Sequence, residues 1–301
     1  MPATPAKLRF QAIHIDVVRN ATDDFNPFHD KHRWQRVVAN PFTGPIALGF
    51  QLECLIEDQM RLYRRQHDED SFIVGEVLRY SNYEFKFVNA VLPGQDIDVL
   101  IKESQLKHGN GTVLSNRVSL KANDKLAIAG YKRESTTPLS PAIIDLSAMG
   151  DLRKIPDRSF LPDTAVHMDV FLKRKYLTTS NAKNFLAGSL VEQSDYIDEL
   201  AERVEFPETF PCALLSSALL ERAWNQGHDF EQKPMVYKSH NFSIDRLCLQ
   251  QARSNDALHL LSFHADPVAQ LHTYDCFGII GADRLLFSAR IELMPLTVDQ
   301  P

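Results

Sequence analysis

Tyr80-Ser81-Asn82-Tyr83-Glu84-Phe85 returns in the second half of the chain as Tyr237-Lys238-Ser239-His240-Asn241-Phe242. Each stretch follows an apolar segment of helical period that ends at a His-Asp pair, His67-Asp68 in the first half and His228-Asp229 in the second. Two features that recur in the same order at nearly the same offset indicate an internal repeat. The chain of 301 residues is long enough for two such units.

Both apolar segments have the spacing of a core helix. The second runs from Pro211 to Trp224. The first begins near Gly49 and places its apolar residues on one face, at Leu48, Leu52, Leu55, Ile56, Met60 and Tyr63.

Strand-like segments of alternating polarity follow each helix, with turn signals such as Pro93-Gly94 and Asn123-Asp124 between them. One long helix followed by several antiparallel strands predicts an α+β unit in which the sheet wraps the helix. We expect an N-terminal unit at 1–134, a Pro-containing linker at 135–163 and a C-terminal unit at 164–301.

The residues best suited to chemistry lie in Asp24-Phe25-Asn26-Pro27-Phe28-His29. The Asn-Pro step favours a turn, because proline disfavours helix for the residue before it. Asp24 and His29 are therefore expected to face the same small volume, where a carboxylate and an imidazole that share a water can transfer protons. The structural alternative is a capped surface loop.

Gly49 lies in the first turn of the first helix, where backbone N–H groups lack intrahelical partners. Without a side chain, it allows a ligand oxygen to approach those donors closely. The N–H of Gly49 would then stabilise the enolate that develops from a thioester carbonyl. Close packing of the helix on the sheet is the alternative role for this glycine.

These two segments together resemble the MaoC-like, R-specific enoyl-CoA hydratase group of hot-dog proteins. The resemblance implies a double hot-dog fold and a hydratase or dehydratase acting on a 2-enoyl or 3-hydroxyacyl thioester. It implies that Asp24 and His29 are the catalytic residues, Asn26 supports them, and the N–H of Gly49 forms the oxyanion hole. It implies no metal or other cofactor, since the acyl group is carried on coenzyme A or an acyl carrier protein.

The sequence departs from the family pattern at two positions. Asp23 stands where a Gly usually precedes the catalytic Asp, and Leu48 stands where a His usually precedes the oxyanion Gly. The second unit has no Asp-His pair at 180–189, where we expect the motif to recur. We therefore expect the second unit to supply pocket walls for an acyl chain, or to be retained for folding alone.

Composition favours a globular enzyme over a nucleic-acid or membrane partner. The net charge is −6 and no dense block of Lys and Arg is present. Residues 1–7 lack the apolar segment of a signal peptide, so we expect a cytoplasmic protein, as a monomer or homodimer. Buried, reduced thiols are expected for Cys54 and Cys212 in helices and for Cys248 and Cys276 in strands.

Two other functions remain open. In several hot-dog thioesterases and dehydratases the catalytic acid lies on the core helix, so a thioesterase here would use Glu53, which we otherwise place at a partly exposed helix edge. A non-catalytic acyl-thioester-binding protein is the other alternative. His259, His264 and His272 fit no metal-ligand spacing and are expected to face solvent on strands.

Overall fold

The computed structural model describes residues 7–109, 111–161, 169–265 and 271–296. The boundary predicted between residues 163 and 164 lies outside these ranges, as do residues 1–6. The first half contains β1 (Leu8–Arg9), α1 (Ala12–Thr22), the 3₁₀ turns η1 (Pro27–His29) and η2 (Trp34–Arg36), α2 (Gly49–Gln66), α3 (Glu69–Gly75), β2 (Tyr80–Phe87), β3 (Asp96–Ile101), β4 (Gln105–Gly109), β5 (Gly111–Ala122) and β6 (Lys125–Ser135).

The second half repeats this order with small insertions. It contains η3 (Leu146–Met149), η4 (Leu152–Lys154), β7 (Ser159–Phe160), β8 (Phe171–Leu177), α4 (Thr179–Gly188), η5 (Gln193–Asp195), β9 (Ile197–Asp198), η6 (Glu199–Ala201), β10 (Arg203–Val204), α5 (Thr209–Ala213), α6 (Leu215–Asn225), β11 (Met235–Asp245), α7 (Arg246–Gln250), β12 (Asp256–His264), β13 (His272–Ile280) and β14 (Arg284–Pro295).

One continuous sheet joins the halves. Its strand order is β1-β3-β5-β6-β2-β11-β14-β13-β12-β8-β7, and β4 pairs with β5. The two strands predicted as a repeat, β2 and β11, are antiparallel neighbours at the centre, where Tyr83 lies opposite Phe242 and Phe85 opposite His240. Outward from this pair the strand order is equivalent on both sides, so a pseudo-twofold axis relates the two units. The structure is an α+β double hot dog.

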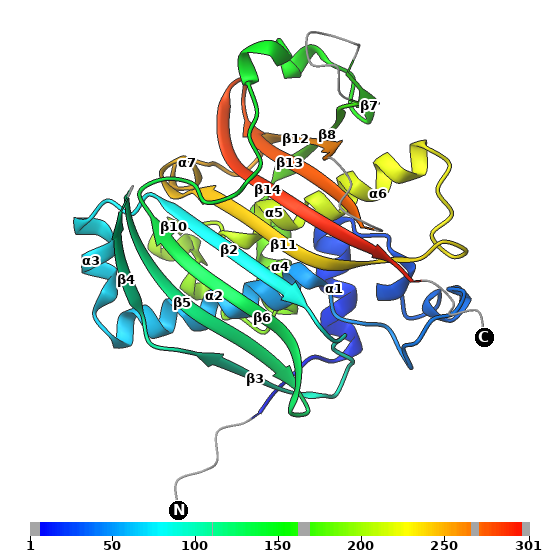
Figure 1. Cartoon of the computed structure of the whole chain (residues 1–301), viewed down its shortest axis with the longest axis horizontal. Helices are drawn as coiled ribbons and strands as arrows, with labels where there is room; N and C mark the ends of the chain where they lie inside the picture. The colour runs from blue at the N-terminus through cyan, green and yellow to red at the C-terminus, as the bar shows by residue number, and fades with distance from the viewer. Residues whose placement is uncertain (1–6, 110, 162–168, 266–270, 297–301) are drawn as a thin grey trace, which may run out of the picture.

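The helices lie against one face of this sheet (Figure 1). Their apolar faces and the inner face of the sheet form one large core that includes residues from both halves. Helices α1 and α4 approach closely at Gly188, where a Cβ atom would lie 2.5 Å from Val18 Cγ2 and 2.8 Å from the carbonyl oxygen of His14. Within the described ranges, none of the helices combines the length and apolar character that crossing a bilayer requires.

Several local predictions are confirmed. Helix α2 begins at Gly49, as the apolar period indicated. Asn123 and Asp124 have φ angles of 46° and 64° and connect β5 to β6, as expected for a tight hairpin turn. All four cysteines are buried and unpaired.

Other local predictions are wrong. The second core helix is not continuous but is divided into α5 and α6 around Leu214. Cys248 lies in the short helix α7, not in a strand. His259 is fully buried on β12, because both faces of this strand are covered, whereas His264 and His272 are exposed as expected. The short alternating pattern around these residues could not predict that the second face of β12 is also covered.

The predicted position of the missing motif is also wrong. Residues 180–189 lie almost entirely in α4, which corresponds to α1 and not to the loop after it. The equivalent loop follows α4 and leads into η5, as the loop after α1 leads into η1. In that loop Val191 takes the place of Asp24 and Asp195 takes the place of His29. The second half therefore lacks the Asp-His pair, as predicted, but for a different stretch of sequence.

Candidate active site

The loop after α1 is folded tightly by its own polar groups. The backbone N–H of Asn26 donates to Asp24 Oδ1 at 2.9 Å, and that of Phe28 donates to Asn26 Oδ1 at 3.2 Å. Proline at position 27 opens the 3₁₀ turn η1, where its fixed φ is favourable and its missing N–H costs nothing. Asp24 and His29 are only 3% and 5% exposed, so the loop is not the capped surface loop of the alternative interpretation.

The ring of His29 is held in one orientation. Its Nδ1 lies 2.8 Å from the carbonyl oxygen of Ile46, which can only accept a hydrogen bond. Nδ1 therefore carries the proton in the neutral ring, and Nε2 presents a lone pair. The N–H of Ile46 in turn donates to the carbonyl of Phe28 at 3.0 Å, so the motif and the segment leading to α2 hold each other in place.

The first turn of α2 is anchored by Gln51, which is fully buried. Its Oε1 accepts the N–H of Leu48 at 3.2 Å, and its Nε2 donates to the carbonyl of Gly188 at 2.7 Å. In the part of the chain that the structure describes, no protein acceptor lies within hydrogen-bond distance of the N–H of Gly49. Helix α2 thus presents a free donor at its N-terminus.

Asn26, His29 and Gly49 line one cavity of about 260 Å³, which we call the central cavity. The rest of its lining is mostly apolar and comes from both halves: Phe28, Phe42, Ile46, Leu52, Phe87 and Val91 from the first, and Met235, Val236, Tyr237, Met294 and Leu296 from the second. An apolar cavity with a few convergent polar groups is the usual form of a small-molecule site.

Asp24 does not line the central cavity. It lines a smaller neighbouring space of about 40 Å³, the side cavity, with apolar residues of α6 such as Leu219 and Ala223. Asn26, Met235 and Tyr237 line both cavities, so the two spaces adjoin at these residues. The prediction that Asp24 and His29 face the same small volume is therefore not confirmed, because they line adjoining cavities. The hydroxyl of Tyr237 lies 2.9 Å from Ser216 Oγ, and burial raises the pKa of this tyrosine.

The two departures from the family pattern have structural explanations. Asp23 is the C-cap of α1 with φ of 54°, a left-handed conformation that glycine adopts most easily. Its side chain is 70% exposed and pairs with Lys175, so its charge faces solvent and a cation. Leu48 is 2% exposed and belongs to the core.

The prediction that Glu53 lies at a partly exposed helix edge is wrong, because this residue is fully buried. Its carboxylate oxygens lie 3.0 and 3.2 Å from Nδ1 of His240, which is also fully buried on β11 of the second half. Burial raises the pKa of Glu53, and the neighbouring imidazole counteracts that rise. Glu53 does not line the central or the side cavity.

Tyr237 and Met235 line this site but were not identified from the sequence, and neither was His240 as the partner of Glu53. The repeat placed Tyr237 and His240 on a strand, but only pairing of β2 with β11 brings that strand beside α2. No group of three or more potential metal-ligating side chains gathers within the described residues.

No protein-family model and no curated protein sequence matches the chain. Its fold is similar to that of solved structures. A structure described as a MaoC-like dehydratase has a TM-score of 0.59 at 11% identity, with coverage of 97% of this chain and 96% of the other.

A conserved hypothetical protein from Mycobacterium tuberculosis, described as having a double hot-dog fold, has a TM-score of 0.58 at 12% identity. The match covers 97% of this chain and 94% of that protein. The chain thus has a double hot-dog fold, similar to that of a structure described as a MaoC-like dehydratase.

Proposed function

We propose that this protein is a hydratase or dehydratase that acts on a 2-enoyl or 3-hydroxyacyl thioester. The observation that carries the proposal is that His29, with its Nδ1 bound to the carbonyl of Ile46, and Gly49, with its free N–H, line one apolar cavity. A base with a fixed tautomer and an oxyanion donor are the two groups that hydration of an enoyl thioester needs.

The reaction is proposed to occur where the central and side cavities meet. His29 Nε2 takes a proton from water as the water oxygen bonds to C3 of the substrate. The electrons of the C2–C3 double bond then move toward the thioester oxygen, whose negative charge the N–H of Gly49 stabilises. The protonated imidazole returns a proton to C2, and Asp24 orients the water from the side-cavity wall. Dehydration follows the same steps in reverse.

The lining explains why an acyl thioester suits this site. Apolar residues of both halves surround the central cavity, and among the described residues that line it the only lysine or arginine is Lys238. Burying an acyl chain there contributes about 0.8 kcal/mol for each methylene removed from water. The second half accordingly supplies walls but no catalytic residue. We propose no metal or other cofactor for this chemistry. The acyl carrier, coenzyme A or carrier protein, would remain at the cavity mouth.

Substitution of the two motif residues tests the proposal. Asp24→Asn and His29→Ala should each reduce hydration of a crotonyl thioester by at least about 100-fold, the usual contribution of general acid–base groups. The assay follows loss of the enoyl absorbance, and circular dichroism verifies that each variant is folded.

Two matched substitutions control for the loss of a carboxylate charge and for the loss of an imidazole ring. Asp23→Asn changes an adjacent but mostly exposed carboxylate, and His32→Ala removes an exposed imidazole of the same loop. Both controls should keep near wild-type turnover. Wild-type turnover in folded Asp24→Asn or His29→Ala would refute the roles proposed for these residues.

The two alternatives give different results in the same experiments. A thioesterase that depends on Glu53 would release free thiol from an acyl-CoA, and Glu53→Ala but not Asp24→Asn would abolish this release. The burial of Glu53 against His240, away from both cavities, supports the hydratase over this alternative. A non-catalytic binding protein would bind acyl-CoA tightly without turning over any enoyl thioester.

A further inference from the structure

A third cavity lies where the pseudo-twofold axis would place the counterpart of the central and side cavities. It has a volume of about 590 Å³, and we call it the polar cavity. The side cavity is lined by Ser216, Leu219, Leu220 and Ala223 of α6, whereas the polar cavity is lined by Glu57, Met60, Arg61 and Arg64 of α2. These are equivalent faces of the two core helices.

The strands beside the polar cavity are also equivalent but differ in chemistry. β14 contributes Leu293 and Met294 to the central and side cavities, while the corresponding part of β6 contributes Lys132 and Glu134 to the polar cavity. The catalytic pair is absent here, because Val191 and Asp195 occupy the positions of Asp24 and His29. This site lacks the catalytic groups, and charged side chains make up a larger share of its lining than of the central cavity's.

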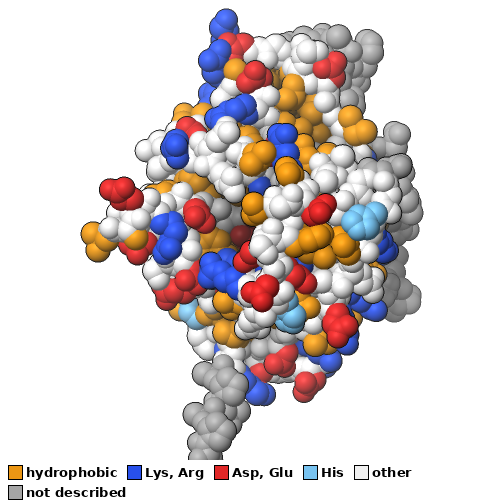
Figure 2. All heavy atoms as spheres, turned by 90° about the vertical axis from the view of Figure 1, so that its left-hand side faces the viewer, with side chains coloured by type: hydrophobic (Ala, Val, Ile, Leu, Met, Phe, Trp, Pro, Cys, Tyr) orange, Lys and Arg blue, Asp and Glu red, His pale blue; other side chains and the backbone are white. Residues whose placement is uncertain are grey.

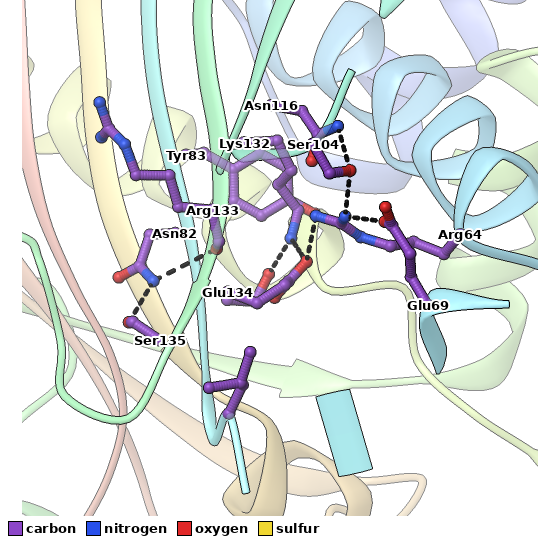
Figure 3. A network of polar contacts seen from close by, with 12 residues as sticks. Arg64, Glu69, Asn82, Tyr83, Ser104, Asn116, Lys132, Arg133, Glu134 and Ser135 are labelled. Carbon is purple, nitrogen blue, oxygen red and sulfur yellow. Dashed lines mark hydrogen bonds and ion pairs between the residues drawn. The ribbon is translucent and has the colours of Figure 1, made fainter. Parts of the chain in front are cut away.

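Five carboxylates line the polar cavity, and those of Glu134 and Glu208 already have partners, whereas Asp70 and Glu205 form no ion pair within the described residues. Glu134 accepts from Lys132 Nζ at 2.6 Å and forms an ion pair with Arg246. Glu208 accepts from Arg246 Nε at 2.7 Å and from Tyr83 Oη at 2.7 Å. Figure 3 shows Arg64 from α2 and Lys132 from β6 converging on Glu134.

Glu57 is satisfied in the same way. Its oxygens accept the backbone N–H of Glu208 at 2.8 Å and that of Thr209 at 2.9 Å. The carboxylates of Glu57, Glu134 and Glu208 therefore require no bound cation, because donors of the protein already satisfy them.

Arg61 and Arg64 of α2, in contrast, have N–H donors without hydrogen-bond partners. Arg64 is 3% exposed, and its Nε has no partner within the described residues. Its Nη1 pairs with Glu69, and its Nη2 makes no hydrogen bond but lies 3.8 Å from Glu134 Oε1. Nη1 of Arg61, one turn earlier on α2, is also unpartnered there, although its Nη2 pairs with both Asp58 and Asp195. Buried donors without partners are rare in folded proteins and indicate a group that completes them.

We propose that the polar cavity is a separate binding site for the anionic group, carboxylate or phosphate, of a small polar ligand. The guanidinium of Arg64 is suited to this role because its planar donors match carboxylate and phosphate oxygens. The repeat thus has one apolar site and one polar site at equivalent positions, and only the apolar site has catalytic groups.

The outer face of this end of the molecule is accessible to such a ligand. Figure 2 shows the face that carries α3, where acidic and basic side chains are interspersed with apolar ones. Ile73 and Val74 of α3 line the polar cavity and belong to this face. A small ligand can therefore reach the arginines from solvent beside α3 without passing through the acyl site.

Binding of two probe anions tests the proposal. Full-length protein is titrated with inorganic phosphate and, separately, with malonate, each against sodium chloride at equal ionic strength, by calorimetry and thermal unfolding. At least one anion should bind saturably and raise Tm by a few degrees at saturation, since a ligand that binds only the folded state stabilises it. A response to phosphate alone or malonate alone identifies which group the site prefers.

Arginine variants locate the binding. R64Q and R61Q should weaken the affinity at least tenfold, while R65Q, which changes an exposed arginine on the same helix, should leave it within twofold. If R64Q does not fold, R61Q decides. No saturable response to either anion in the folded wild type, or equal affinity in R61Q and R65Q, would overturn the proposal. Because the acyl site is not involved, these outcomes are independent of hydratase activity.

Discussion

Replacement of Gly49 by alanine separates the packing role of this residue from its proposed catalytic role. An ideal Cβ at this position would lie 2.9 Å from Phe87 Cζ and 3.2 Å from His240 Cε1, against a normal carbon contact of about 3.5–4.0 Å. His240 cannot move easily because it is buried and bound to Glu53, so the ring of Phe87 or the first turn of α2 must shift.

The expected loss of stability is small. Overpacking a core costs about 1–3 kcal/mol, whereas alanine is favoured over glycine in a helix by up to about 1 kcal/mol. We therefore expect Gly49→Ala to lower the free energy of unfolding by at most about 2 kcal/mol, measured by urea denaturation.

The expected loss of activity is much larger. The new methyl group narrows the cavity beside the N–H donor and displaces the thioester oxygen, and a displacement of about 1 Å can reduce the rate about 100-fold. Hydration of a crotonyl thioester should fall by at least this factor. Gly75→Ala is the matched control, because nothing lies within 4 Å of a Cβ at that helix position. Turnover by Gly49→Ala within twofold of wild type would refute both the oxyanion role and the geometry from which it is inferred.

Two further substitutions test buried carboxylates that line neither the central nor the side cavity. Glu53→Ala should lower the free energy of unfolding by about 3–5 kcal/mol, because it leaves His240 buried without its partner; a change below 1 kcal/mol in urea denaturation would contradict this. Burial, together with the nearby Glu208, raises the pKa of Glu57 from 4.5 to about 7, so its contribution to stability is complete below pH 4.5 and is lost as the pH rises through 7. Glu57→Gln should remove this part of the pH dependence, at most about 1.4 kcal/mol per pH unit, and Glu76→Gln, at an exposed site, should not; an unchanged slope in Glu57→Gln would contradict the raised pKa.

Local sequence patterns were sufficient to predict the architecture of each unit. The apolar period of α2, the hairpin at Asn123-Asp124 and the recurrence of Tyr80–Phe85 at Tyr237–Phe242 all report conformation or burial within a few residues. The same applies to the motif, whose Asn-Pro step fixes the turn that buries Asp24 and His29. The α1 helix was not predicted, because its apolar positions Ile15, Val18 and Ala21 form only a short stripe.

The composition of the site depended on contacts between distant parts of the chain. Tyr237 and Met235 reach the cavity wall, and His240 reaches Glu53, only because β2 and β11 are neighbours at the centre of one sheet. Spacing alone also could not show that Asp24 and His29 line separate, adjoining cavities.

The sequence by itself determined that the protein has two similar units, a tight Asn-Pro turn with Asp24 and His29 in the first and a glycine at the start of its core helix. These features follow from backbone preferences and from the period of apolar residues, which act over one or two turns. The tertiary structure alone decided which second-half residues close the central cavity, where Glu53 is buried, and that an equivalent polar cavity exists. Those contacts join residues more than a hundred positions apart, and strand order in the sheet, which no local pattern encodes, brings them together.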